Sequence, residues 1–413
     1  AFSPDAFRPV DGRIDTAVFR EIAEPARAGA DTVAAAAESV RALDDTPLMR
    51  PVRAAVDEVS ELLDTGASAT DALARASTLL PAMLGSSGER TYLLAFQNNA
   101  EWRSTGGIVG AMAIVKTADG RIELAGQASS SDFSNFGEPV LPLDPEIERI
   151  YETRPGRYIQ NVTQIPDFSV GGPLAREMLL RQTGQSVDGV IATDPVALSY
   201  ILEATGPVEL PTGDVVSADN AVPLLLNDVY SRYESPRDQD AFFAAASAAV
   251  FERLASGAAD PAKLIAALGR AGDERRLLLW SAIPEDQAVL ADTTLAGPLP
   301  DTDADTAAFG VFLNDGTGSK MDYYLTADTR LAWETCAVGG DGRTSSPVTL
   351  EVTIANNAPA DAATSLPSYV TGGGAFGVPA GVARTVAYLY LPEGYALSSA
   401  TRSDGAGFGG GSH

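Results

Sequence analysis

The sequence has almost no histidine and almost no cysteine. Its only histidine is His413, the last residue, and Cys336 is the single cysteine among 413 residues. Without an internal histidine, a Ser-His-Asp or Cys-His triad and a histidine-ligated zinc site are both excluded. A lone cysteine excludes an intrachain disulfide and a thiolate metal cluster, and we expect its side chain to be buried as a small apolar group. Acid–base chemistry must therefore use carboxylates, with arginines as the cationic groups.

Positive charge is also scarce. Asp and Glu number 55 against 29 Lys and Arg, which gives a formal net charge of -26, and the only lysines are Lys116, Lys263 and Lys320. Such a chain repels phosphate backbones, so we expect no nucleic-acid partner. No apolar run reaches the roughly 18 residues of a membrane span. The start of the sequence reads as trimmed, so we expect membrane attachment only through an anchor preceding residue 1.

Apolar spacing predicts a helical beginning followed by an α/β core. Residues 14–84 are Ala-rich with helical periodicity, and Pro47 and Pro51 separate two long helices. From Thr91 onward, short buried strands alternate with helices, one of them expected at 218–233, which is typical of a mixed sheet covered by helices. From about Arg275 the chain reads as β-rich and sandwich-like, with strands expected at 277–280, 309–313, 321–325, 348–354 and 385–391. The expected parts are a helical stalk or packing segment (1–85), an α/β catalytic core (86–275), a β-rich module (276–408) and the remnant of an expression tag (409–413).

The segment 97–107 carries the highest density of candidate catalytic and binding side chains. It lies between two apolar runs, so we interpret it as a loop at a sheet edge, where active sites are common. Its polar side chains include Asn99, Glu101 and Arg103, with Trp102 between the last two. The glycines at 106 and 107 allow a ligand close to the backbone. The alternative is an ordinary polar loop with a salt bridge.

Three further segments carry candidate residues. Asn161 and Asp167 lie in an irregular stretch, and Asp132 follows the third expected strand, although a proline before Asp167 also suits a simple turn. Asp228 and Arg232 are four residues apart, so an ion pair on one helical face is the alternative to a substrate-binding role. The run 314–322 superficially resembles a cation loop but lacks the ligand spacing of a calcium site, so we interpret it as a turn and expect no metal. Near Asp228, Tyr230 and Tyr233 suit sugar stacking, and Arg237 suits an anionic or hydroxyl-rich ligand.

Several of these runs resemble a domain of unknown function common in actinobacterial envelope proteins. The resemblance covers residues 90 to about 325 and implies an extracellular or envelope location. The matching runs are 96–103 with 105–107, 166–168, 188–195 and 313–315.

The same core more distantly resembles the LytR-CpsA-Psr family, which transfers lipid-linked cell-wall polymers onto peptidoglycan. The similar runs are 187–190 through 206–209, and 217–244 with its Arg237. That family uses acidic residues to hold magnesium and several arginines to clamp a pyrophosphate. Its Arg-x-Asp-Thr pattern is here Arg103-Ser104-Thr105-Gly106, without the aspartate, and its Arg-Asp pair is here Ser131-Asp132. Part of the charge neutralisation that phosphoryl transfer requires is thus missing.

Carboxylates flanked by Asn, Arg and aromatic side chains are instead suited to glycoside chemistry. We expect a glycoside hydrolase or transglycosylase acting on an envelope polysaccharide, with mycobacterial-type D-arabinan as the first candidate and no cofactor. Glu101 is the first catalytic candidate and Asp167 or Asp132 its partner. The alternatives are a magnesium-dependent phosphotransferase that attaches glycopolymers, and a non-catalytic polysaccharide-binding module. The expected substrate-binding residues are Asn99, Trp102, Arg103, Asn161, Asp228, Tyr230, Arg232 and Arg237.

Overall fold

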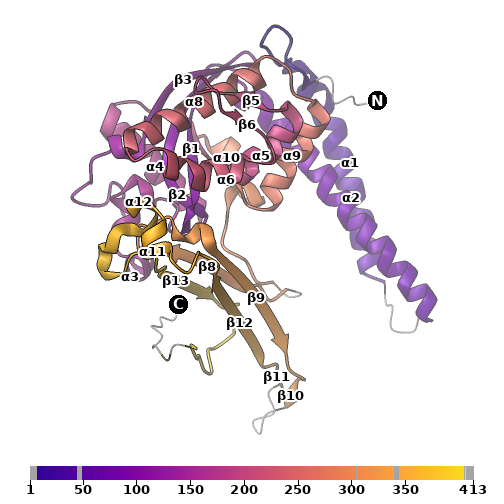
Figure 1. Cartoon of the computed structure of the whole chain (residues 1–413). Coiled ribbons are helices and arrows are strands. Elements are labelled where there is room, and N and C mark those ends of the chain that lie inside the picture. The colour runs from indigo at the N-terminus through magenta and orange to yellow at the C-terminus, as the bar shows by residue number, and fades with distance from the viewer. Residues whose placement is uncertain (1–6, 44–48, 304–305, 339–343, 404, 406–413) are drawn as a thin grey trace.

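A computed structural model describes residues 7–43, 49–303, 306–338, 344–403 and 405. Pro47 and the expected tag remnant at 409–413, with His413, lie outside the described residues. The chain forms a mixed α/β structure in which helices surround one five-stranded sheet (Figure 1). No helix among the described residues has both the length and the apolar character needed to cross a membrane.

Two long helices form a hairpin at the N-terminal end, as the sequence predicts. Helix α1 spans Ala17–Arg41 and helix α2 spans Arg50–Met83, and they pack along each other (Figure 1). The far end of the hairpin projects from the rest of the chain. Near its other end, Arg75 of α2 donates a hydrogen bond of 2.9 Å to the Val289 carbonyl, which fastens the hairpin to the sheet domain.

The central sheet combines parallel and antiparallel pairs. Its strand order is β3-β2-β1-β4-β7, and only β1 and β4 run parallel. Strand β7 was expected to begin the β-rich part, but it pairs with β4 in this sheet. The strands are β1 (Arg90–Arg103), β2 (Gly106–Ala118), β3 (Arg121–Ser129), β4 (Gly189–Thr193) and β7 (Leu277–Ser281).

Apolar side chains join the sheet to its helices. Leu93 of β1 and Met112 of β2 are buried against Phe168, Leu174 and Met178 of α4. A second core lies between α5, the helical pieces at 221–232, α8 and the segments at 321 and 362–370. The longer helices are α4 (Phe168–Thr183), α5 (Pro195–Thr205), α8 (Pro236–Ala255) and α9 (Pro261–Asp273), with α3 (Pro145–Tyr151) and α10 (Pro284–Leu290) as shorter ones.

The single helix expected at 218–233 is divided. Its consecutive pieces are α6 (Ala221–Pro223), the π-helical turn η5 (Leu224–Asp228) and α7 (Val229–Arg232). Other short pieces are η2 (Ser130–Asp132), η3 (Arg154–Gly156), η4 (Ile159–Asn161), η6 (Thr294–Ala296), α11 (Ala362–Ser365), α12 (Ser368–Thr371) and η8 (Gly372–Gly377).

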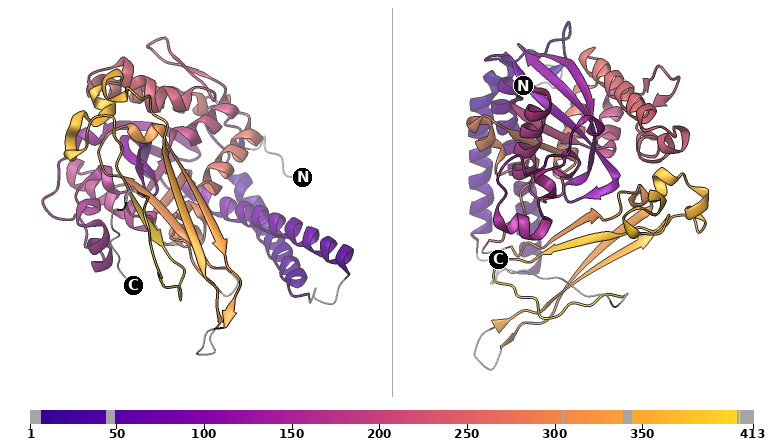
Figure 2. Two further views of the ribbon diagram at one scale, coloured as in Figure 1. Left: turned by 60° about the horizontal axis from the view of Figure 1, so that its bottom comes forward. Right: turned by 90° about the vertical axis from the view of Figure 1, so that its left-hand side faces the viewer.

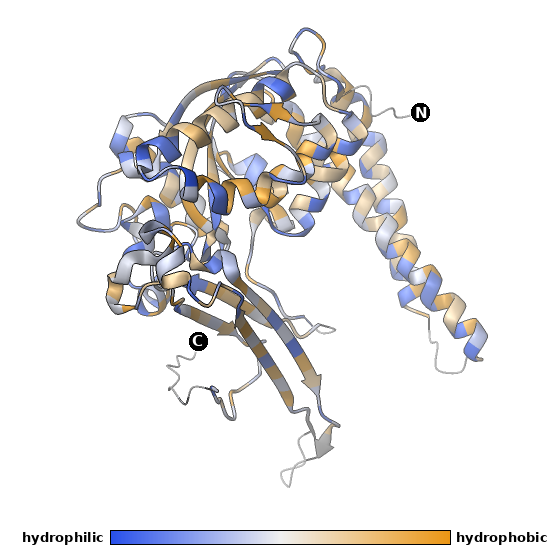
Figure 3. Cartoon of the chain, in the orientation of Figure 1, coloured by the Kyte–Doolittle hydropathy of each residue, from blue (hydrophilic) through white to orange (hydrophobic). Residues whose placement is uncertain are grey.

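The C-terminal strands form two-stranded ribbons that extend away from the sheet (Figure 2). Polar and apolar residues alternate along them (Figure 3). The strand expected at 321–325 is wrong, because 321–324 form the 3₁₀ turn η7 (Met321–Tyr324). Cys336, expected to be buried, is exposed. The C-terminal strands are β8 (Gly310–Asp315) with β13 (Thr385–Tyr390), β9 (Leu325–Trp333) with β12 (Val348–Asn356), and β10 (Ala337–Val338) with β11 (Thr344–Ser345). Earlier in the chain, β5 (Val208–Glu209) pairs with β6 (Val215–Val216) in a separate short ribbon.

Candidate functional site

The end of strand β1 departs from regular pairing. The segment expected as a loop instead continues β1 to Arg103 and turns directly into β2 at Gly106. Asn98 pairs with Ile108 and Trp102 with Gly107, so residues 99–101 bulge from the ladder. A β-carbon on Gly107 would lie 2.3 Å from the Asn98 carbonyl oxygen, so only glycine allows this close approach. Such bulges redirect side chains, and this one carries Asn99 and Glu101.

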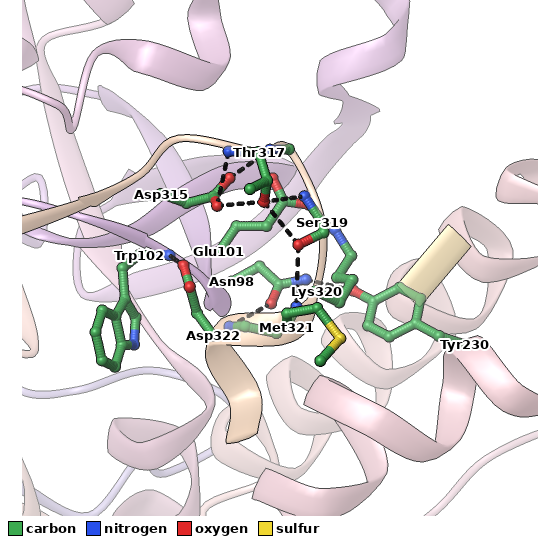
Figure 4. Close-up of polar contacts among 12 residues, drawn as sticks. Asn98, Glu101, Trp102, Tyr230, Asp315, Thr317, Ser319, Lys320, Met321 and Asp322 are labelled. Carbon is green, nitrogen blue, oxygen red and sulfur yellow. Dashed lines mark hydrogen bonds and ion pairs between the residues drawn. The ribbon is translucent and has the colours of Figure 1, made fainter. Parts of the chain in front are cut away.

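The segment 314–322, which connects β8 to η7, binds the bulged end of β1 (Figure 4). The Trp102 amide donates to Asp322 Oδ2 at 2.7 Å, and the Ser104 amide donates to Asn314 Oδ1 at 3.0 Å. Asn314 in turn donates to Ser104 Oγ at 2.8 Å. These bonds place Lys320 and Asp322 beside Glu101 in space, although more than two hundred residues separate them in sequence.

Glu101 forms a buried ion pair with Lys320, and their side chains are 8% and 7% exposed. Lys320 Nζ also lies 5.0 Å from the ring centroid of Tyr230 and 5.1 Å from that of Tyr369. Burial lowers the pKa of Lys320, but Glu101 and the two tyrosines outweigh it, so the pKa is above its usual value. Lys320 therefore stays a cation and compensates the Glu101 carboxylate.

Asp322 is only 2% exposed, and within the described residues it forms no ion pair with a lysine or arginine. Burial, reinforced by Asp315 and Glu101, raises its pKa to about 8, although the Trp102 amide and Arg103 act in the opposite direction. At neutral pH the carboxyl is therefore largely protonated. Its Oδ1 atom is buried and has no hydrogen-bond partner in the described part of the chain.

Asp315 organises the turn that carries Lys320. Its carboxylate accepts hydrogen bonds from the Thr317 amide at 2.9 Å, the Thr317 hydroxyl at 2.6 Å and the Gly318 amide at 2.5 Å. Thr317 Oγ1 is 2.7 Å from Ser319 Oγ, which continues the network (Figure 4). Burial raises the pKa of Asp315, and these hydrogen bonds oppose the shift.

Several predicted residues do assemble around this cluster. Arg103 donates to Asn161 Oδ1 at 3.3 Å and to the Trp102 carbonyl at 2.8 Å. Asn99 donates to Asp194 Oδ2 at 2.9 Å, and Arg276 binds the same carboxylate oxygen at 2.9 Å.

The two predicted partners of Glu101 instead cap local structure. Asp132 is exposed and accepts from the Ser129 amide at 2.8 Å, which closes a capping box on η2. Asp167 is the N-cap of α4 and accepts from the Ser169 amide at 2.8 Å. Both arrangements satisfy backbone donors at the start of a helix. Neither residue hydrogen-bonds to the Glu101 cluster among the contacts described.

The segment around Asp228 also differs from expectation. The alternative of an ion pair between Asp228 and Arg232 does not hold, because Arg232 binds Asp214 at 2.5 Å and Asp228 accepts from Asn227 at 3.2 Å. Tyr230 is buried, and its hydroxyl accepts a hydrogen bond from Asn98, so its ring belongs to the core behind Lys320. Arg237 is exposed in the first turn of α8.

Sequence reasoning missed Lys320 and Asp322 as site residues because it interpreted 314–322 as a turn. The available signal was a rare lysine flanked by small and apolar residues and followed closely by an aspartate. The described ranges contain no group of three or more His, Cys, Asp or Glu side chains placed to hold a metal ion.

Comparisons with known proteins give a partial family match. Residues 87–230 match a family described as "Protein of unknown function (DUF4012)". No curated protein matches the chain. Among solved structures, protein gbs0355 from Streptococcus agalactiae is similar over 51% of this chain and 75% of its own, with 10% identity and a TM-score of 0.30.

Proposed function

We propose that this chain is a carbohydrate-active enzyme, a glycoside hydrolase or transglycosylase, in which Glu101 and Asp322 form the catalytic carboxyl pair. The proposal is supported by the different surroundings of the two carboxyl groups. Asp322 is buried with a pKa raised to about 8, whereas Glu101 is ion-paired with Lys320. A buried carboxyl that keeps its proton, beside a carboxylate paired with a lysine, supplies the acid and the base or nucleophile of glycoside cleavage.

We assign the two catalytic roles from the contacts of each carboxyl group. Asp322 donates its proton to the leaving glycosidic oxygen as the bond to the anomeric carbon breaks. Glu101 acts on the anomeric carbon, either directly or through a water or sugar hydroxyl that it deprotonates. The Trp102 amide holds Asp322 Oδ2, which leaves Oδ1 as the oxygen available for donation. Lys320 forms an ion pair with the Glu101 carboxylate, at the cost of burying both charges.

The proposed substrate is an envelope polysaccharide, and D-arabinan is the first to test. The resemblance of runs such as 96–103 and 188–195 to actinobacterial envelope proteins supports this choice, as does the incomplete phosphate clamp at Arg103-Ser104-Thr105-Gly106. The corresponding site of action is outside the cell or within the envelope.

The test is product formation from purified mycobacterial arabinogalactan and lipoarabinomannan, with and without EDTA, analysed by mass spectrometry. We expect release of arabino-oligosaccharides that EDTA does not affect. Glu101→Gln and Asp322→Asn should each lower the rate by at least about 100-fold, as expected for loss of an acid–base group. Asp260→Asn is the matched control, because this exposed residue only caps α9, where asparagine also caps well.

Other outcomes would contradict the proposal. Polymer binding without any product favours a binding module. EDTA-sensitive consumption of a pyrophosphate-linked lipid donor favours a phosphotransferase. Thermal melting of each variant separates loss of chemistry from loss of fold.

A further inference from the structure

Three buried polar atoms without partners lie on segments that meet near the carboxyl pair. In the described part of the chain, Arg103 Nε, Gln164 Oε1 and Asp322 Oδ1 are buried and make no hydrogen bond. Leaving such a group unpaired costs about 1–3 kcal/mol each. Three of them on segments that contact one another therefore suggest a site that an external group completes.

These atoms come from segments that the fold brings together. Arg103 ends β1 and binds Asn161. Asn314 donates both to Ser104 Oγ at 2.8 Å and to the Gln164 carbonyl at 3.3 Å, so Gln164 lies against the β1–β2 turn. Asp322 binds the amide of Trp102, the residue before Arg103.

The three atoms differ in whether they donate or accept hydrogen bonds. Arg103 Nε–H is a donor, Gln164 Oε1 is an acceptor, and a protonated Asp322 both donates and accepts. A phosphate or carboxylate ligand offers only acceptors, whereas a sugar hydroxyl both donates and accepts. The mixture therefore fits hydroxyl groups better than it fits an anion.

The charges around the site also favour an uncharged ligand over an anion. Lys320 is paired with Glu101, and the cation that acts on Asp322 is Arg103. The chain as a whole carries a formal charge of -26. A polyanion would meet repulsion at long range and no surplus of positive charge at the site.

We propose that Arg103, Gln164 and Asp322 form a subsite for the hydroxyl groups of an uncharged sugar unit, so that the substrate is a neutral glycan and not a phosphorylated or uronic-acid polymer. This subsite rests on the proposed function, since it positions the sugar whose bond the Glu101–Asp322 pair cleaves. Gln164 thereby becomes a specificity-determining residue.

Binding measured by calorimetry tests the subsite independently of turnover. The probes are neutral arabinogalactan and the same polymer after carboxymethylation. We expect wild type to bind the carboxymethylated polymer at least about tenfold more weakly. Gln164→Leu and Arg103→Lys should each weaken binding of the neutral polymer about tenfold, which corresponds to about 1.4 kcal/mol. Gln127→Leu, an exposed glutamine on β3, should leave binding unchanged.

The outcomes separate the two proposals. Neutral-selective binding that depends on Gln164, without product, keeps the subsite and removes the catalytic proposal. Product formation with equal binding of both polymers, or with Gln164→Leu unaltered, overturns the subsite and keeps the enzyme. Absence of binding to either polymer overturns the subsite outright. The comparison of polymers uses wild type alone, so an unfolded variant does not prevent the test.

Discussion

At the scale of single residues, the unusual feature is a set of ionisable side chains in the interior. Glu101, Lys320 and Asp322 are each less than 10% exposed, and such residues are rarely buried unless paired. Glu101 and Lys320 satisfy that requirement through each other. Asp322 satisfies it by keeping its proton, because its pKa is raised to about 8.

The raised pKa of Asp322 predicts how stability depends on pH. An unfolded aspartate titrates near about 3.9, so between about pH 4 and 8 the folded state holds a proton that the unfolded state has lost. The contribution of Asp322 is therefore fully present below pH 4 and declines as pH rises to 8, by up to about 1.4 kcal/mol per unit. Urea unfolding at several pH values should show wild type losing stability relative to Asp322→Asn across this window and no further above it. A stability difference independent of pH would contradict the raised pKa.

Sequence reasoning identified only part of the site at this scale. Glu101, Arg103 and Asn161 were predicted because they stand in polar runs between apolar strands, and the structure brings Arg103 and Asn161 together. Asp132 and Asp167 stand in similar runs but serve as caps. A sequence does not distinguish an aspartate that caps a helix from one that faces a buried carboxylate, because both follow the same turn-forming residues.

At the scale of elements, the site depends on the contact between the bulged end of β1 and the segment 314–322. Two backbone amides of the β1–β2 turn, those of Trp102 and Ser104, bind side chains of this segment. The Glu101–Lys320 ion pair is the third link. The turn and the C-terminal ribbons are thus coupled by buried polar contacts.

A double-mutant cycle measures that coupling. Lys320→Met leaves the Glu101 carboxylate buried without its counter-charge and should destabilise the fold by about 3–5 kcal/mol. Adding Glu101→Gln removes the buried charge and should restore part of that loss. Urea unfolding of wild type, both single variants and the double variant gives the coupling energy.

The matched control is an exposed lysine–glutamate pair on the same sheet. Lys116 and Glu89 are 3.1 Å apart, with side chains 39% and 57% exposed. The cycle of Lys116→Met and Glu89→Gln should give a coupling of at most about 1 kcal/mol. Equal coupling in the two pairs, or simple additivity for Lys320 and Glu101, would contradict a buried, mutually dependent ion pair.

Local patterns predicted individual elements well and their junctions less well. The two N-terminal helices were expected from Ala-rich helical spacing and are present. The segment 97–107 was expected as a loop because polar residues and two glycines interrupt the apolar alternation. It remains in strand β1 because the neighbouring segment 314–322 supplies partners for its backbone, and that partnership has no local signal.

At the scale of the whole molecule, alternating strands and helices predicted a mixed α/β core, and the five-stranded mixed sheet confirms it. The order of its strands was not predictable from periodicity. Strand β7 follows the helical segments α5, α6, η5, α7, α8 and α9 and joins the sheet at its edge, beside β4. Long-range pairing of this kind depends on how helices pack, which a one-dimensional pattern does not contain.

The C-terminal ribbons also show that a sequence pattern predicts strands but not how the strands pair. Alternation along 348–354 correctly predicted a strand, β12. The expectation of a sandwich assumed two packed sheets, whereas the described strands pair only two by two. Leu331 and Trp333 of β9 and Ile354 of β12 are correspondingly exposed.

In the proposed reaction, a protonated Asp322 and the Glu101 carboxylate cleave a glycosidic bond together. The most direct test is the rate of oligosaccharide release from arabinogalactan by wild type as a function of pH. Because the acid must keep its proton, the rate should fall above about pH 8, roughly tenfold for each further unit. No product at any pH, or a rate that keeps rising between pH 8 and 10, would contradict the claim.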